Sequence, residues 1–310
     1  MAHITNRGIE KKERAAAELT SHDRTLFQQA WMQFKYNRRA MFGLAVIVLL
    51  LLMVLITIVI DISTNNSVYN ELVLSQHLEN KLAAPSAKHV LGCDEFGRDL
   101  LFRLIWGTKY SLLIGFCAVS FSLLTGGMLG MIAGFYGGRV DNVIMRIMDI
   151  FMACPFILLA MAIVAALGAS TLNLLIALGV SGMASSSRVS RAAVMSVRDK
   201  EFVESARAVG ASDFTILFKY ILPNAMAPIL VQFTLSIGSS ILHVAGLSYI
   251  GLGIQPPTPE WGAILTAAKT YMRDAWHISV FPGLVILITV VAFNLFGDGL
   301  RDALDPKLKR

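Results

Sequence analysis

One ionisable side chain, His243, stands inside a long apolar stretch of this sequence, within the string SSILHVAGLSYIGLG. Burying an ionisable group inside a membrane span is costly, so such a residue is a candidate for function. An imidazole at this position could contact a substrate on a translocation path or act as a transient ligand for a metal ion. It could also be a neutral ring that is hydrogen-bonded to a neighbouring helix. The residue by itself leaves these interpretations open.

Motifs that would make the chain an enzyme are missing. No Gly-Lys dipeptide occurs, which excludes a Walker A phosphate loop, and there is no His-Glu-x-x-His metal motif, nucleophile elbow or pair of intramembrane carboxylates. Cys93, Cys117 and Cys154 show neither metal-ligand spacing nor a disulfide framework. We therefore expect no enzymatic activity, no catalytic residue, no resident metal and no cofactor. If ATP is used, a separate polypeptide must bind it.

A second candidate for function is the polar stretch from Val197 to Pro223, which lies between two apolar segments. Its charged residues include Asp199, Lys200, Glu201, Glu204, Arg207, Asp213 and Lys219. On insertion scales each charge at a helix centre costs about 2.5–3.5 kcal/mol, so the stretch cannot cross a bilayer. We expect it to lie at the membrane face.

The same stretch carries helix signals on both sides of a glycine. Apolar residues share one helical face in each half: Phe202, Val203, Ala206 and Val209, then Phe214, Leu217, Phe218 and Ile221. Gly210 is expected to end the first helix, either Ser212 or Asp213 to cap the second, and Pro223 to stop it. The pattern predicts two short helices that form a compact projection, and such a projection indicates a partner with a matching groove.

The composition of the chain indicates that the elements which position these residues are membrane-spanning helices. Hydrophobic residues make up 55% of the 310 residues and charged residues 15%, which is typical of an integral membrane protein. Six apolar spans are predicted: 40–60, 110–135, 143–167, 172–193, 227–250 and 278–297. The fold is therefore expected to be all-α and polytopic, with six transmembrane helices over residues 40–300. No cleavable signal peptide is expected, because residues 1–39 are charged and lack an early apolar run.

Both ends of the chain are expected in the cytoplasm. Of the 27 Lys and Arg residues, most fall in 1–39, in 301–310 or in the segments that the six spans place on the same side as the polar stretch. The positive-inside rule puts that side in the cytoplasm. The net charge of +6 thus reflects topology, and no nucleic-acid partner is expected. An apolar face over Leu26, Phe27, Ala30, Trp31 and Phe34 predicts a short helix in the membrane interface before the first span.

Local patterns in the spans predict packing features. Small residues recur at four-residue spacing, which allows another helix to approach closely, whether from this chain or from a second one: Ala118, Ser122, Gly126, Gly130, Gly134 and Gly138. Pro155 should kink the third span, and Arg146 is expected to pair with Asp149. Outside the membrane, Arg98 is expected to pair with Asp94 and Asp99.

The polar stretch resembles the cytoplasmic signature loop of ABC-importer permeases. In that loop Glu-Ala-Ala is followed four residues later by glycine and then by an apolar-Leu-Pro ending. The matching positions are Glu204, Ser205, Ala206, Gly210, Ile221, Leu222 and Pro223, with serine at 205 where alanine is usual. The resemblance implies that this coupling loop, residues 197–223, docks into a groove on a separate ATPase subunit and couples ATP hydrolysis to the spans.

Further motifs resemble one branch of that family, the importers of peptides, nickel and opines. They are LGCDEFGRD from Leu91 with the Arg103, Gly107 and Ser111-Leu112 that follow, the loop PPTPEWG, and the ending AFNLFGDGLRDALDP. The resemblance implies a cell inner-membrane protein that forms half of a translocation pathway. Its implied partners are a homologous permease, two ATP-binding subunits, an extracytoplasmic solute-binding protein and membrane lipid.

The substrate stays open between two classes. Di- or oligopeptides are the first expectation, and nickel or a metal chelate is the alternative, because the string from His243 to Gly246 looks like nickel permeases. An ion-coupled secondary transporter is a more distant alternative and would require acidic residues at the membrane midplane. A membrane scaffold without transport would not need so specific a cytoplasmic loop.

Overall fold

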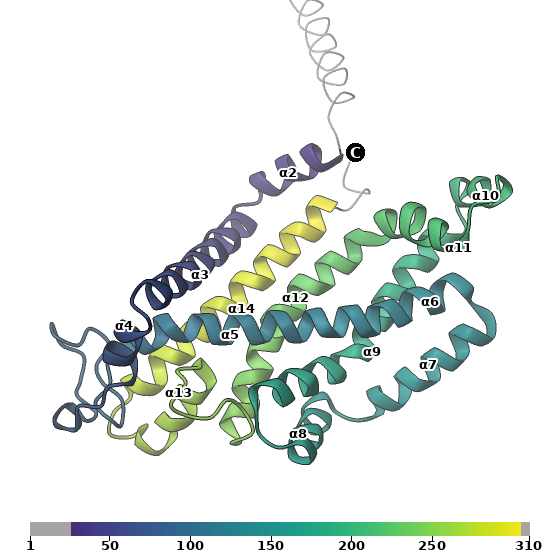
Figure 1. The fold of residues 1–310 in the computed structure, drawn as a ribbon. Coiled ribbons are helices and arrows are strands. Elements are labelled where there is room, and N and C mark those ends of the chain that lie inside the picture. The colour runs from purple at the N-terminus through teal and green to yellow at the C-terminus, as the bar shows by residue number, and fades with distance from the viewer. Residues whose placement is uncertain (1–25, 305–310) are drawn as a thin grey trace, which may run out of the picture.

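Long apolar helices dominate the computed structural model, which describes residues 26–304 (Figure 1). Five of them are long and apolar enough to cross a membrane: Arg38–Ser63, Leu100–Tyr136, Thr171–Arg198, Asp213–Tyr249 and His277–Leu304. The pair Gly138–Ala153 and Phe156–Leu167 would make a sixth if it is one span. Within residues 26–304 no strand is formed, which confirms the all-α class. The five or six candidate spans are consistent with the predicted six.

The first two helices lie at the N-terminal side of the bundle. Helix α2 (Leu26–Tyr36) precedes α3 (Arg38–Ser63), and the side chain of Asn37 caps α3 by accepting hydrogen bonds from the backbone of Arg39 and Ala40. Phe34 of α2 is buried against Ala40 and the end of the last helix. A helix at this position was predicted. Residues 1–25 and 305–310, which hold most of the N-terminal segment and of the tail, lie outside the described residues.

The second span is a long helix with one π-helical turn. It comprises α5 (Leu100–Ser122), the π-helical turn Leu123–Gly127 and α6 (Met128–Tyr136). Its glycines lie against α9 (Thr171–Arg198): a Cβ placed on Gly126, Gly130 or Gly134 would lie 2.2, 2.0 or 2.8 Å from the carbonyl oxygen of Met183, Ser187 or Arg191. At these three positions the small-residue stripe therefore packs on a helix of its own chain and not on a second chain.

The third span is broken rather than gently kinked. Helices α7 (Gly138–Ala153) and α8 (Phe156–Leu167) meet at an angle of 87°, and Pro155 stands directly before α8. The predicted pair of Arg146 and Asp149 is wrong. Asp149 instead pairs with Arg188 of α9, with Nη2 to Oδ1 at 2.6 Å, because a neighbouring helix brings its guanidinium closer.

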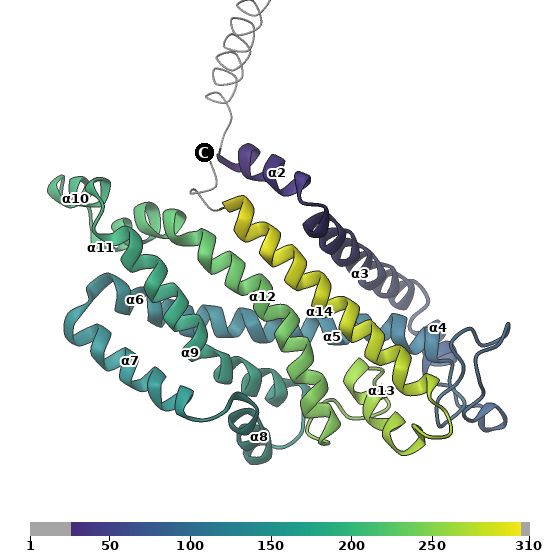
Figure 2. The ribbon, with the colours of Figure 1, turned by 180° about the vertical axis from the view of Figure 1, so that it is seen from behind.

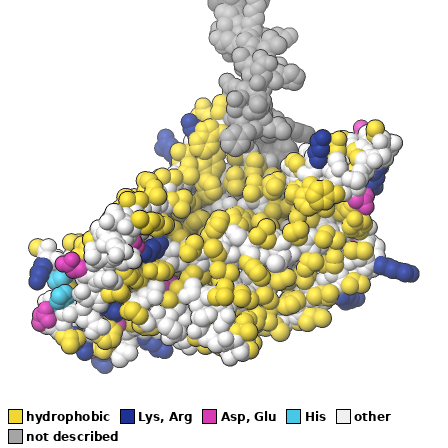
Figure 3. Space-filling model, viewed as in Figure 1, with side chains coloured by type: hydrophobic (Ala, Val, Ile, Leu, Met, Phe, Trp, Pro, Cys, Tyr) yellow, Lys and Arg dark blue, Asp and Glu magenta, His cyan; other side chains and the backbone are white. Residues whose placement is uncertain are grey.

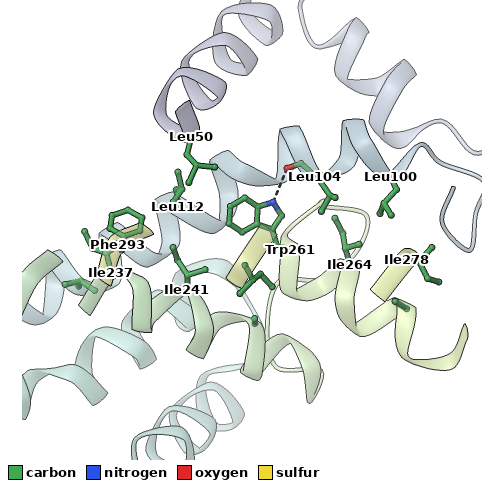
Figure 4. Packing of buried hydrophobic residues seen from close by; sticks show 14 of the residues in the cluster. Leu50, Leu100, Leu104, Leu112, Ile237, Ile241, Trp261, Ile264, Ile278 and Phe293 are labelled. Atoms are coloured by element: carbon green, nitrogen blue, oxygen red, sulfur yellow. Dashed lines mark hydrogen bonds between the residues drawn. The ribbon is translucent and has the colours of Figure 1, made fainter. Parts of the chain in front are cut away.

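The last two spans, α12 (Leu222–Tyr249) and α14 (His277–Leu304), run side by side (Figure 2). Between them the chain forms α13 (Trp261–Ala268), and Trp261 is buried among side chains from α5, α12 and α14 (Figure 4). Glu260 caps α13 and accepts four hydrogen bonds, from Ser111, Ser248 and two backbone N–H groups of α13. Burial raises the pKa of Glu260, whereas these donors oppose the rise.

The segment between α3 and α5 contains only short helical turns: Ser67–Tyr69, Asn70–Leu74 and Leu78–Asn80. Arg98 pairs with Asp94, with Nε to Oδ2 at 2.7 Å, as predicted. Asp99 instead caps α5, because it is the last residue before the helix begins. Its carboxylate also contacts the ring of His89. This charged end lies on the far side of the helices from the coupling loop, and an apolar surface covers the helices between the two ends (Figures 1 and 3).

Candidate functional site: the coupling loop and a hydroxyl-lined cavity

The first half of the coupling loop is a helix with one face buried. Helix α10 (Glu201–Ala208) follows directly after α9, and its Val203 and Ala206 are buried. They pack in one cluster with Ile216, Leu217 and Ile221 from the second half of the loop. The two halves are therefore held together by apolar contacts, to which each predicted apolar face contributes two of its four residues.

A glycine turn ends α10. Gly210 has a φ of +83°, its N–H donates to the carbonyl of Arg207, and the N–H of Ala211 donates to the carbonyl of Ala206. This pair of hydrogen bonds is the Schellman arrangement, which strongly favours glycine at the left-handed position. The following helix is capped by Ser212, whose Oγ accepts from the N–H of Thr215, so the choice between Ser212 and Asp213 falls on the serine.

The second half of the loop differs from the prediction. Pro223 does not stop a short helix, because α11 (Asp213–Thr215), the π-helical turns Ile216–Ile221 and α12 form one apolar helix from Asp213 to Tyr249. The wider π-helical turns Ile216–Ile221 end just before Pro223, the second residue of α12, so the helix departs from regular α-geometry where the proline enters it. The coupling loop is thus one short helix and the beginning of a membrane span, not two short helices.

The predicted coupling residues divide between a buried and an exposed face. Ala206 and Ile221 are buried in the apolar cluster, and Leu222 is half-buried. Glu204, Ser205 and Pro223 are exposed, and Ser205 Oγ donates to the carbonyl of Glu201.

The exposed side of the loop is apolar as well as polar. Phe202, Val209, Phe214 and Phe218 are 39%, 87%, 72% and 36% exposed, and the rings of Phe214 and Phe218 lie 4.5 Å apart. We call these four residues the apolar loop patch. Sequence reasoning placed all four on the helices' apolar faces without separating them from the buried ones. An exposed apolar patch with charged neighbours is typical of a protein-binding surface.

A second candidate site is a cavity of about 220 Å³ between α5, α9 and α12. Serines dominate its wall, and it contains no Asp, Glu, Lys or Arg: Ala118, Val119, Ser122, Phe156, Leu178, Ser181, Gly182, Ser185, Ser186, Gln232, Ser236, Ser239, Ser240 and His243. The two helices that leave the coupling loop, α9 and α12, supply most of this wall. The cavity and the loop are therefore connected by continuous helices.

His243 lies in the wall of this cavity. Its ring stacks on Phe156, the first residue of α8, with centroids 4.0 Å apart and planes at 24°. No hydrogen bond joins its ring nitrogens to another residue in 26–304, so the bonded imidazole that the sequence left open is not found there. Nor do residues 26–304 contain a group of three His, Cys, Asp or Glu side chains that could hold a metal ion.

Sequence reasoning missed the serines and Gln232. A signal was present in α12, where Gln232, Ser236, Ser239 and His243 follow one another at three- and four-residue spacing and so share a helical face. A polar face within an apolar span favours a position inside the bundle. The complementary serines of α9 could not be matched to it without the packing of the two helices.

Comparisons with known proteins agree with this geometry. Residues 126–310 match the family model described as the binding-protein-dependent transport system inner membrane component. Residues 25–85 match the model of the N-terminal transmembrane domain of oligopeptide transport permease C.

Similar curated proteins cover most of the chain. The di/tripeptide transport system permease protein DppC of Pseudomonas aeruginosa is 44% identical over 282 residues, which are 91% of this chain and 92% of the relative. The dipeptide transport system permease protein DppC of Alkalihalophilus pseudofirmus is also 44% identical, over 91% of this chain and 90% of its own length. The glutathione transport system permease protein GsiD of Pectobacterium atrosepticum is 47% identical over 73% of this chain and 75% of its own length.

Solved structures share the fold at low sequence identity. A chain of the MetNI methionine ABC transporter, described as inward facing, has a TM-score of 0.56 at 19% identity and covers 66% of this chain and 98% of its own. A chain of an amino acid ABC transporter has a TM-score of 0.52 at 16% identity, over 65% of this chain and 94% of its own.

Proposed function

Because the chain belongs to the family of binding-protein-dependent transport system inner membrane components, we propose that it forms half of the pathway of an ATP-driven importer of short peptides. The observation that carries the proposal is the apolar loop patch, which projects from the end of the two helices that wall the cavity. The importer role agrees with the predicted function. The peptide substrate rests on relatives whose names state di/tripeptide, dipeptide or glutathione transport.

The proposed partners follow from the surfaces of the molecule. Two ATP-binding subunits would serve the complex, one of them docked on the apolar loop patch, and a homologous permease would complete the pathway. A soluble binding protein would deliver the peptide on the opposite face. In this arrangement both termini and the coupling loop lie in the cytoplasm of a cell whose inner membrane holds the complex, and ATP is bound by the separate subunits alone.

The mechanism uses the continuity of the helices. When ATP draws the two ATPase subunits together, α10 moves with the subunit that grips it, because its apolar outer residues are buried in that contact. The movement passes to α9 through the short link at Asp199 and Lys200, and to α12 through the glycine turn and the apolar cluster. Since both helices wall the cavity, their movement changes which end of the cavity is open.

The alternatives have less support. No observation favours nickel, because His243 has no second metal ligand among the described cavity residues. An ion-coupled transporter would need an unpaired acidic residue near the midplane, whereas Asp61 lies in the last turn of α3 and is paired with Lys109. The chain itself is proposed to carry no enzymatic activity.

Gly210 tests the coupling role. Gly210→Val forces a β-branched residue into a φ of +83°, which costs about 1–3 kcal/mol, although no neighbouring atom lies within 4 Å of a Cβ at this position. We expect the valine variant to reach the membrane and assemble. Its ratio of peptide uptake to ATP hydrolysed should fall at least about tenfold.

The matched control is Gly210→Asn, because asparagine tolerates the left-handed conformation better than other non-glycine residues. Both variants are measured as reconstituted complexes in vesicles, with uptake of a labelled dipeptide and release of phosphate recorded together. Normal uptake per ATP in the valine variant would rule out the glycine turn as a coupling element.

A further inference from the structure

The cavity wall is polar without being charged. Seven serines line it together with Gln232 and His243, and none of its lining residues is Asp, Glu, Lys or Arg. Polar side chains within apolar spans are unfavourable unless they have partners or a use, so a concentration of hydroxyl groups at one place requires an explanation.

Helix packing accounts for only part of these groups. Ser122 and Ser186 are hydrogen-bonded to each other across α5 and α9, and Gln232 donates to Ser236 within α12. By contrast, the Oγ of Ser181 is buried without a hydrogen-bond partner. The ring nitrogens of His243 are likewise not hydrogen-bonded to any described residue. The cavity therefore holds hydrogen-bonding capacity that the fold itself does not use.

We propose that the cavity is a binding subsite for the main chain of a short peptide, which is a deeper statement about the pathway and rests on the proposed function. A peptide backbone presents N–H donors and C=O acceptors, and a serine hydroxyl serves either as donor or as acceptor. Hydroxyls on two facing helices can thus replace the water around successive peptide groups. His243, held flat by Phe156, supplies one further donor or acceptor in the same wall.

The absence of charge in the described lining lets the subsite accept peptides of either charge. A fixed carboxylate or ammonium would bind the opposite charge of a peptide tightly and slow its release, whereas passage requires contacts that form and break readily. The subsite therefore binds what all short peptides share and ignores the charge of their side chains. Discrimination between peptides is left to the soluble binding protein.

Ser239 offers a direct test, because it lines the cavity and is exposed. Its hydroxyl donates a 3.4 Å hydrogen bond to the carbonyl of Leu235 in its own helix and joins no other described helix. Ser239→Asp places a carboxylate in the subsite, and Ser239→Asn is the uncharged variant of nearly the same shape. Ser63→Asp is the control for added charge, since Ser63 is exposed at the end of α3 and does not line the cavity.

The measurement is ATP-driven uptake of alanyl-lysine and of alanyl-glutamate by the complete complex, including the binding protein, in reconstituted vesicles. Each variant's ratio of the two rates is divided by the wild-type ratio, so that the preference of the binding protein cancels. We expect Ser239→Asp to change this double ratio by about tenfold, because a carboxylate in a partly desolvated cavity treats the two side chains oppositely. Ser239→Lys should change it in the other direction, and Ser239→Asn and Ser63→Asp should leave it within about twofold of one.

Three results would overturn the subsite. They are a double ratio near one for both charged Ser239 variants, an equal shift in Ser63→Asp, and an equal loss of both peptides in a complex that still assembles and hydrolyses ATP. A wild-type complex that imports neither peptide would contradict the proposed function instead, so the two failures are distinguishable.

Discussion

His243 shows how a single residue acquires meaning from its surroundings. Its ring stacks on Phe156 with centroids 4.0 Å apart, so one face is shielded, and the residue lines the cavity. Stacking of this kind fixes the plane of the imidazole, and a fixed plane directs its hydrogen bonds. The residue thus fits a contact on the peptide path better than a metal ligand, for which residues 26–304 supply no companions.

Replacing His243 separates these roles. His243→Ala should lower dipeptide uptake by about two- to tenfold, which corresponds to the loss of one hydrogen bond of about 0.5–1.5 kcal/mol. Assembly of the complex should be unchanged, because the ring makes no hydrogen bond to the rest of the described chain. The measurement is uptake of labelled dipeptide beside uptake of radioactive nickel, in the same vesicles.

The matched control is His77→Ala, since His77 is exposed in the segment between α3 and α5 and lies away from the cavity. Selective loss of nickel uptake with peptide uptake intact would restore the nickel alternative and remove His243 from the peptide path.

At the scale of elements, the contact between α6 and α9 depends on the absence of a Cβ atom in glycine. Gly126, just before α6, and Gly130 and Gly134 within it form a glycine seam: they face backbone carbonyls of α9 at distances that no Cβ could tolerate. Close approach of this kind compensates for the low helix propensity of glycine, about 1 kcal/mol per residue against alanine in water. Because α9 leads directly into α10, the seam also fixes where the coupling loop begins.

The seam can be tested with one added methyl group. Gly130→Ala should destabilise the protein by about 1–3 kcal/mol, because the new Cβ would lie 2.0 Å from the carbonyl oxygen of Ser187 and the helices would have to separate. Gly246→Ala in α12 is the matched control, since no atom outside its own helix lies within 4 Å of the added carbon. There the gain in helix propensity should leave stability unchanged or raise it by up to about 1 kcal/mol.

Thermal unfolding in detergent, followed by the loss of helical circular dichroism, compares the two alanine variants under one condition. If both variants unfold at the wild-type temperature, the close approach of α6 and α9 does not contribute to stability.

At the scale of the whole molecule, the charged groups gather at two ends and an apolar surface lies between them (Figure 3). One end carries the ion pairs of Arg98, Asp94 and Arg103, and the other carries the coupling loop. This division matches a chain that crosses a membrane several times. In the proposed importer, the cavity would then lie between the face that receives the peptide and the face that receives the ATPase.

Labelling of single cysteines checks this orientation. In a background with Cys93, Cys117 and Cys154 replaced by alanine, Leu78→Cys should react in intact cells with a thiol reagent that does not cross the membrane, because Leu78 is 65% exposed in the segment between α3 and α5. Val209→Cys, at a position 87% exposed in the coupling loop, should react only after the cells are opened. Its reaction should then be slowed when the ATPase subunits are bound.

The reverse labelling pattern, with Val209→Cys accessible from outside, would place the coupling loop on the wrong side for any cytoplasmic motor and would end the importer proposal. Equal reactivity of Val209→Cys with and without the ATPase subunits would contradict docking at this surface alone.

The sequence by itself determined the features that depend on near neighbours in the chain. The all-helical class, the apolar spans, the glycine turn at Gly210 and the helix before the first span all follow from composition and from three- and four-residue spacing. The family was also evident from short motifs, because each motif lies within a few consecutive residues.

Only the tertiary structure decided which distant residues meet. It paired Asp149 with Arg188 instead of Arg146, continued the helix past Pro223 through π-helical turns, and brought serines of α5, α9 and α12 around one cavity. The physical reason is that these outcomes depend on the packing of helices far apart in sequence, where small differences in distance select among partners that local patterns treat as equal.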